Sequence, residues 1–247
     1  MVSIEKKIDI VVNWLREVVK ESGTNGLIVG LSGGIDSSVV SFLIKKAFPE
    51  DSMGVILPCK SNDKDKADAE AVAKACDIDY TEVDLSDTHD LLMGKVDVAM
   101  GDRNRVNMQL TDANLRARLR MSTLYTIANS KNYLVVGTDN AAELLTGYFT
   151  KYGDGGVDIL PIAGLTKREV FEWAKHLGVP QSVIDRKPSA GLWEGQTDED
   201  EMGTTYDLID DYIEGKEIPE KDKAIIERMN KRSEHKRVMP SMPPKFQ

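Results

Sequence analysis

The chain of 247 residues predicts an α/β fold, in which a doubly wound parallel sheet carries helices on both faces. Short apolar runs bounded by turn-forming residues alternate along the chain with segments of helical periodicity. The runs are rich in Val, Ile and Leu, which is typical of strands buried on both faces. Ligands of such sheets bind beyond the carboxyl ends of the strands, so the loops that follow the strands are where a site is expected.

The first half of the chain supplies an amphipathic helix and then three strands separated by helices. Apolar residues at helical spacing over residues 3–21 predict the opening helix. A glycine pair lies between the first strand and its helix, and Pro49 ends that helix. The predicted strands are residues 27–31, 53–57 and 80–85, and the helices between them are residues 35–48 and 63–76.

The second half continues this pattern and then becomes helical. Thr166 and Glu169 form a Thr-x-x-Glu capping box that opens a helix to residue 177, which Gly178 and Pro180 end. We expect a single domain over residues 1–247. The other predicted elements are a long helix at 110–129, strands at 133–136 and 158–162, a turn-rich stretch at 187–203, an acidic helix around 202–213, a basic helix at 221–232 and a Pro-rich extended tail.

The composition excludes several classes of protein. Lys and Arg total 32 against 41 Asp and Glu, a net charge of −9 that counts against nucleic acid as the main partner. The acidity is concentrated in residues 194–220, so the rest of the chain can still host an anion site. We find no apolar run of membrane-helix length, and we expect no signal peptide and no membrane partner. Cys59 and Cys76 form no CxxC pair, which predicts two buried, reduced thiols and a cytoplasmic protein.

The strongest chemical signal is the string Ser-Gly-Gly-Ile-Asp-Ser-Ser at residues 32–38, between the first strand and its helix. Two glycines let the backbone approach a phosphate, and the helix N-terminus directs free N–H groups and a positive dipole at it. Asp36 is an oxygen ligand of the kind that Mg²⁺ prefers. The string lacks the lysine of a Walker A loop. The alternative is an ordinary glycine turn in which Asp or Ser caps the helix.

A second cluster, residues 137–148, follows the fourth strand at the same edge of the sheet. It contains Glu143, which falls in the first turn of the next helix, where the helix dipole favours an anion. Asp36 and Glu143 could therefore share one Mg²⁺. The alternative is a helix cap at Asn140 or Asp139 with a solvent-exposed Glu143.

The order of the motifs resembles one enzyme family. Residues 32–37 are similar to the pyrophosphate loop of the N-type ATP pyrophosphatases, which have a Rossmann-like (adenine nucleotide α-hydrolase-like) fold. With residues 137–148, the whole resembles the ammonia-dependent NAD synthetases, and the likeness runs from about residue 29 to the C-terminus. The further matching pieces are Phe-Thr-Lys-Tyr-Gly-Asp-Gly-Gly-Val-Asp at 149–158, Leu-Pro at 160–161, Leu-Thr-Lys at 165–167, Asn114-x-x-Ala117-Arg118, 187–193 and 235–237.

The resemblance implies roles for particular residues. Asp36, Glu143 and Lys167 would be catalytic, with Asp36 and Glu143 as the Mg²⁺ ligands. The implied ATP contacts are Gly30, Leu31, Ser32, Gly33, Gly34, Ile35, Asp36, Ser37, Thr138, Lys167 and Ser189. The implied contacts with deamido-NAD⁺ are Arg118, Lys151, Asp158, His235 and Lys236. Asn114 precedes Arg118 by four residues, hence lies on the same helix face, and we add it to that set.

The implied reaction is the last step of NAD biosynthesis. The nicotinate carboxylate of deamido-NAD⁺ attacks the α-phosphate of ATP, and ammonia then displaces AMP from the acyl-adenylate. Family members are homodimers with the dinucleotide site at the subunit junction, and the apolar rows of residues 110–129 suit a buried helix pair. The motifs fill the chain, so we expect free ammonia rather than a fused glutaminase.

Several alternatives stay open. A sister enzyme of GMP synthetase or tRNA-thiolating type shares the loop, although the chain lacks the CxxC expected for thiolation. A nucleotide-binding sensor without turnover is the alternative of another class. Residues 187–203, with Trp193, are either a lid or a surface loop. Arg116, Arg118 and Arg120 could be surface charges, and the Lys60 loop has no assigned role.

Overall fold

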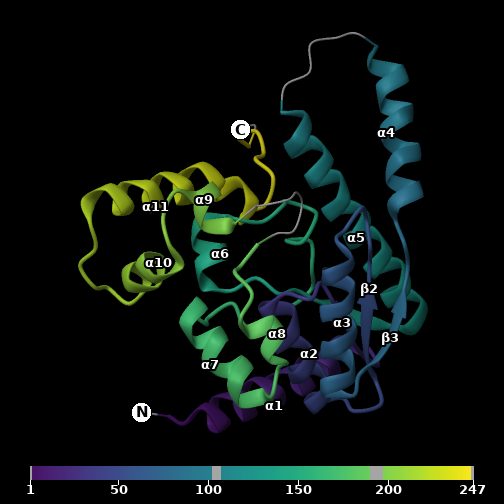
Figure 1. Cartoon of the computed structure of the whole chain (residues 1–247), viewed down its shortest axis with the longest axis vertical. Coiled ribbons are helices and arrows are strands. Elements are labelled where there is room, and N and C mark those ends of the chain that lie inside the picture. Colours follow the sequence, from purple (N-terminus) through teal and green to yellow (C-terminus); the bar gives the residue numbers. More distant parts are fainter. Residues whose placement is uncertain (1, 102–106, 190–196, 246–247) are drawn as a thin grey trace.

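The computed structural model, which describes residues 2–101, 107–189 and 197–245, has a four-stranded parallel sheet with helices packed around it (Figure 1). The strands are β1 Gly26–Gly30, β2 Ser52–Ile56, β3 Asp79–Glu82 and β4 Tyr133–Val136. Their order in the sheet is β3-β2-β1-β4, so the first strand along the chain lies inside the sheet between β2 and β4. The α/β fold class is confirmed.

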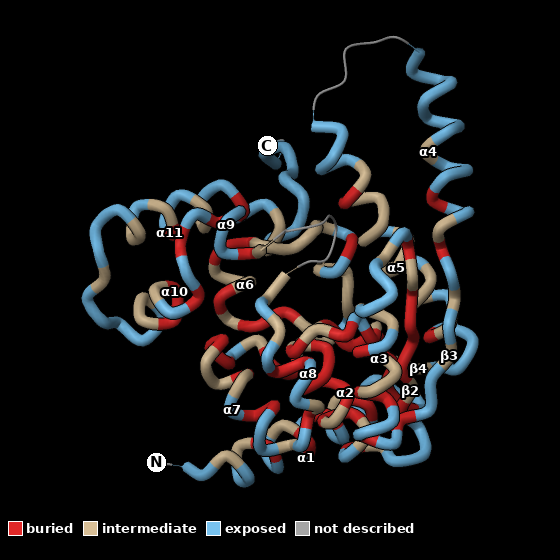
Figure 2. Tube along the Cα trace, viewed as in Figure 1, coloured by how far each residue is buried: buried red, intermediate tan, exposed pale blue. Residues whose placement is uncertain are grey.

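Helices cover both faces of the sheet because β1 presents apolar side chains on both of them. Leu27 and Val29 pack against α1 (Ile4–Ser22), α2 (Ile35–Ala47), α3 (Asp63–Cys76) and α7 (Lys167–Leu177). Ile28 points the other way, with residues of β2 and β4, onto α5 (Met108–Lys131). Figure 2 shows this buried centre below an exposed upper part. Burying one such side chain stabilises the fold by about 1.5–3 kcal/mol. The helices packed on the two faces therefore hold the ends of the strands in place.

Several elements differ from the sequence prediction. The helix α4 (Ser86–Met100) was not predicted, because its apolar residues are spread around the helix and most of them are exposed. It rises from the body beside the N-terminal part of α5 (Figure 1). The predicted strand 158–162 is wrong: it is a single bridge between Val136 and Ile159. A turn at residues 161–164, opened by Pro161, leads the chain away from β4.

The C-terminal helices form a third apolar cluster on the sheet's ligand side. The acidic stretch is two helices, α9 (Asp198–Met202) and α10 (Tyr206–Ile213), because Gly203 breaks it with a left-handed backbone. The basic helix is α11 (Glu220–Ser233), followed by a 3₁₀ turn at Glu234–Lys236. α10 and α11 pack on α6 (Ala141–Thr146), and the short α8 spans Gln181–Ile184. The part of the chain described here holds no helix that is both long and apolar enough to cross a membrane.

Candidate active site

The loop between β1 and α2 forms an anion cradle. Gly34 is the N-cap of α2, so the alternative in which Asp or Ser caps this helix is wrong. Glycine has no side chain with which to cap the helix, and Gly34 to Ser37 line a cleft of about 200 Å³. Gly33 has a φ of +76°, and a Cβ there would lie 2.6 Å from the carbonyl oxygen of Asp65. Because no side chain caps α2, its first N–H groups are available to a phosphate.

Serine hydroxyls fix the shape of this loop. The hydroxyls of Ser32 and Ser37 are 2.9 Å apart, and the Gly34 N–H donates to Ser32 Oγ at 3.2 Å. The hydroxyls of Ser37 and Ser38 both donate to the Gly34 carbonyl. The loop is therefore preorganised, which lowers the entropy cost of closing it around a ligand.

A buried lysine lies at the centre of the small cleft. Lys167, at the start of α7, is 3 % exposed, and its Nζ lies 2.6 Å from Asp36 Oδ2 and 3.7 Å from Glu143 Oε1. Burial alone would lower the pKa of Lys167, but the two carboxylates outweigh it and raise that pKa. Burial and the charge of Asp36 raise the pKa of Glu143 to about 8. The ammonium group is thus charged at neutral pH and joins three segments that are far apart in sequence.

The helix α6 presents Glu143 through a capping box. Asn140 caps α6 by accepting from the Ala142 and Glu143 N–H groups, and Glu143 Oε2 accepts from the Asn140 N–H at 3.1 Å. Asn140 Nδ2 also donates to Asp36 Oδ1 at 2.8 Å. The cap at Asn140 was foreseen as an alternative, but Glu143 lies beside Lys167 instead of in solvent. The cap therefore holds both predicted metal ligands in one network.

Four further carboxylates that line this cleft were not identified from the sequence: Asp65, Asp139, Asp154 and Asp198. Burial raises the pKa of the last three. Among the described residues, one oxygen of Asp139 and one of Asp198 are buried without a hydrogen-bond partner. Asp139 follows β4 and Asp154 sits in the matched Gly-Asp-Gly-Gly turn, so both had a positional signal; Asp198 had none. Buried, unsatisfied carboxylate oxygens indicate a place for a cation.

A larger cleft, of about 640 Å³, adjoins the first and shares Ser32, Asp65, Thr138, Tyr148 and Asp154 with it. This volume is within the range of small-molecule sites. The cleft runs from the carboxyl ends of the strands to the C-terminal 3₁₀ turn. Asn114 Oδ1 accepts from the Thr150 hydroxyl, and Arg118 donates to the Lys151 carbonyl, so these two side chains share a face of α5 as predicted.

Lysines tie the C-terminal segment to this cleft. The Lys151 ammonium donates to the carbonyl of His235. Lys236 donates to the carbonyls of Gly147 and Phe149, at 2.8 and 2.5 Å, and burial lowers its pKa. His235 itself is exposed at the rim. The C-terminal 3₁₀ turn thus forms one wall of the cleft.

Nearly all the predicted site residues line one of the two clefts. Gly33 and Asp158 are the exceptions: Gly33 shapes the loop, and Asp158 accepts from the Val135 N–H at 2.7 Å and from the Tyr125 hydroxyl at 2.9 Å. The predicted residues that line the clefts are Gly30, Leu31, Ser32, Gly34, Ile35, Asp36, Ser37, Asn114, Arg118, Thr138, Glu143, Lys151, Lys167, Ser189, His235 and Lys236.

The residues whose roles the sequence left open form hydrogen bonds or ion pairs within the chain. Arg120 donates to the Leu57 carbonyl and to Ser61 Oγ, both at 3.0 Å, and Arg116 pairs with Asp112 at 2.5 Å. Lys60 pairs with Asp90. Cys59 and Cys76 are free and buried. The proposed lid residue Trp193 lies outside the described residues.

Two clefts at the carboxyl ends of the strands, with an anion cradle and a buried lysine, are the arrangement typical of α/β proteins that bind nucleotide phosphates. The family model described as NAD synthase matches residues 7–240. The chain therefore belongs to the NAD synthase family, and the resemblance inferred from its motifs is confirmed.

Individual relatives agree with this assignment. The NH₃-dependent NAD⁺ synthetase of Alkaliphilus metalliredigens is 64% identical over 245 residues, covering 97% of this chain and 98% of that one. The solved structure of NMN synthetase from Francisella tularensis matches with a TM-score of 0.93 and 38% identity over 100% of both chains. An NH₃-dependent NAD synthetase from Campylobacter jejuni matches with a TM-score of 0.79 and 28% identity, covering 99% of this chain and 100% of that one.

Proposed function

We propose that this chain amidates deamido-NAD⁺ through an acyl-adenylate. It is an enzyme that makes NAD⁺ from deamido-NAD⁺, ATP and ammonia. A carboxylate is a poor electrophile, so its oxygen must first be converted into a good leaving group. The nicotinate carboxylate attacks the α-phosphate of ATP and releases pyrophosphate; ammonia then attacks the carbonyl carbon and releases AMP, which carries away one carboxylate oxygen.

The observation that carries this proposal is the buried ammonium of Lys167 beside the uncapped first turn of α2. Both provide fixed positive charge or N–H donors for the negative charge that develops on the leaving pyrophosphate. The donors are already in place before ATP binds, so stabilising that charge needs little reorganisation. We assign Ser32 to Ser37, Thr138 and Ser189 to ATP in the same way.

The cleft suits a magnesium ion held jointly with ATP. Among the described residues no three His, Cys, Asp or Glu side chains form a site by themselves. Mg²⁺ commonly uses one or two carboxylates and takes its other ligands from substrate phosphates and water. The unsatisfied oxygens of Asp139 and Asp198 fit a cation nearby, and Asp36 and Glu143 would hold it. A bound Mg²⁺ would neutralise phosphate charge.

The large cleft is our proposed site for deamido-NAD⁺. Arg118 and Lys151 offer cations for its phosphates, and Asn114, His235 and Lys236 complete the wall. Asp158 would act there by supporting β4, because each of its carboxylate oxygens already accepts a hydrogen bond within the chain. We further propose a homodimer joined through α5, a single domain that uses free ammonia, and a cytoplasmic location in keeping with two free thiols.

Nicotinate mononucleotide is a second candidate substrate. The structural match to an NMN synthetase extends over both whole chains, which favours testing the mononucleotide. The chemistry at the carboxylate would be the same, and the two substrates differ only in what fills the far end of the large cleft.

The decisive experiment uses deamido-NAD⁺ labelled with ¹⁸O in its carboxylate, with ATP, Mg²⁺ and ammonium. We expect NAD⁺ and AMP in equal amounts, with one ¹⁸O in the phosphate of AMP. Formation of ADP, or AMP without label, would contradict the acyl-adenylate. A parallel reaction with nicotinate mononucleotide compares kcat/KM for the two acids, and xanthosine monophosphate tests the sister-enzyme alternative.

A further inference from the structure

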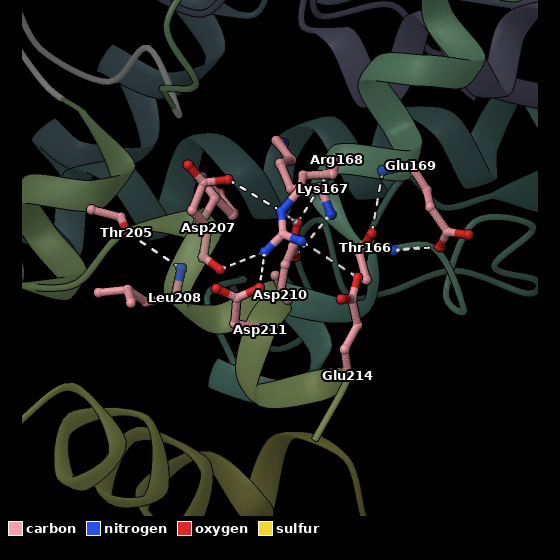
Figure 3. Close-up of polar contacts among 12 residues, drawn as sticks. Thr166, Lys167, Arg168, Glu169, Thr205, Asp207, Leu208, Asp210, Asp211 and Glu214 are labelled. Atoms are coloured by element: carbon pink, nitrogen blue, oxygen red, sulfur yellow. Dashed lines mark hydrogen bonds and ion pairs between the residues drawn. The ribbon is translucent and has the colours of Figure 1, made fainter. Parts of the chain in front are cut away.

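The N-terminus of α7, which carries Lys167, is held by a carboxylate from another helix. Asp210 of α10 is fully buried and accepts from the Lys167 N–H at 3.0 Å and from the Arg168 N–H at 2.9 Å (Figure 3). The cap of α7 itself, Thr166, accepts from the Glu169 N–H instead. Asp210 therefore binds the two first-turn N–H groups that the local cap does not reach.

The same helix also contacts the ammonium end of Lys167. Tyr206 precedes Asp210 by four residues, so both lie on one face of α10. Lys167 Nζ lies 4.7 Å from the centre of the Tyr206 ring, a cation–π distance. The Tyr206 hydroxyl donates to Asp198 at 2.9 Å. One face of α10 thus restrains Lys167 at both its main chain and its side chain.

The helix α10 is itself fixed in place. Between its two contact residues, Ile209 is fully buried in the apolar cluster that includes Ala142 of α6. On the outer side, Arg168 donates to Asp207 at 3.2 Å and to Asp211 at 2.5 Å (Figure 3). The helix therefore connects α6, which presents Glu143, to α7, which presents Lys167.

We propose that Asp210 and Tyr206 are positioning residues for Lys167. Neither lines either cleft, so neither would touch substrate; both would act by keeping the ammonium group aligned with the phosphates. This inference rests on the proposed role of Lys167 in turnover. Small displacements of a catalytic group can lower a rate up to about 100-fold, so the effect should appear in kcat rather than in substrate binding.

The first test compares two isosteric substitutions on α10. Asp210→Asn puts an amide N–H against one of the two backbone N–H groups, whereas Asp207→Asn removes the same charge from a side chain that is 81% exposed. We expect Asp210→Asn to lower kcat roughly 10-fold while the KM for deamido-NAD⁺ stays within about twofold. Asp207→Asn should keep the wild-type kcat. Equal kcat values for wild type and Asp210→Asn would overturn the proposal.

A double-mutant cycle separates positioning from general stability. In a Lys167→Arg background, which keeps a cation, Asp210→Asn should lower kcat by less than about twofold. The same fold loss in both backgrounds would overturn the proposal while leaving the role of Lys167 intact. Unchanged kcat in Lys167→Met alone, which removes the cation, would remove that role, and the inference with it. If Asp210→Asn does not fold, Tyr206→Leu replaces it in the same cycle with the same expected and refuting results.

Discussion

Replacing Lys167 by methionine is the most informative single change, because it removes the ammonium group and keeps an unbranched side chain that is only one atom shorter. In the folded chain the Nζ atom is 2.6 Å from Asp36 Oδ2 and lies near Glu143. Without it, two carboxylates share a buried site with no cation between them. Both the stability of the fold and the rate of turnover should fall.

The structure sets the size of the two effects. Breaking a buried ion pair costs about 3–5 kcal/mol. We expect the low end, about 3 kcal/mol, because Asp36 and Glu143 keep hydrogen bonds from Asn140 and Glu143 can take up a proton. At about 2–4 °C per kcal/mol for a chain of this size, the melting temperature should fall by about 6–12 °C. Losing a donor aimed at developing charge should lower kcat by roughly 10²–10³-fold.

The two effects are measured separately. Thermal unfolding followed by circular dichroism gives the change in melting temperature, and AMP release at 20 °C gives kcat on folded protein. Lys175→Met, at an exposed position of the same helix, is the matched control and should resemble the wild type. A Lys167→Met protein that melts within about 2 °C of the wild type, or keeps more than about a tenth of its turnover, would refute the reasoning.

Three further predictions concern binding, backbone shape and pH. Arg118→Ala should raise the KM for deamido-NAD⁺ far more than that for ATP, and steady-state kinetics showing equal increases would mean that it acts structurally. Gly33→Ala should destabilise the chain by about 1–3 kcal/mol in urea unfolding and weaken ATP binding in calorimetry, because the new Cβ would meet the Asp65 carbonyl at 2.6 Å with φ at +76°. The pKa of Glu143 is raised to about 8 from its ordinary value of 4.5, so the folded state binds more protons than the unfolded state between these two pH values. Its contribution to the free energy of unfolding is therefore fully present below 4.5 and is lost as pH rises through 8, and Glu143→Gln should flatten this fall in urea titrations at successive pH values.

The parts of the fold that local sequence controls were predictable. The residues 133–136 and 63–76 form the predicted strand and helix, and the Thr166–Glu169 capping box forms as expected. The cradle at residues 32–37 was predictable because its glycines and its place after a buried strand are both visible in the sequence. In each case the signal lies within a few residues of the element that it specifies.

The rest depends on contacts between distant segments. The helix α4 has no single apolar face, so periodicity could not identify it. Asp198 enters the small cleft only because α9 and α10 pack on α6, and Asp210 reaches α7 across 43 residues of chain. Asp158 belongs to a matching motif, yet its carboxylate is used to hold β4, which only the three-dimensional arrangement reveals.

That contact at β4 has a consequence for how the protein behaves when it is abundant. Val135 N–H donates to Asp158 and Gly137 N–H donates to the Ile159 carbonyl at 2.8 Å, so backbone groups at this margin of the sheet are already occupied. At the opposite margin, β3 is only four residues long and has Asp79 and Glu82 at its ends. Short, charged or covered edge strands discourage pairing with a strand of another molecule. The sheet is thus guarded at both margins against edge-to-edge aggregation, so crowding alone gives it little tendency to grow into fibrils.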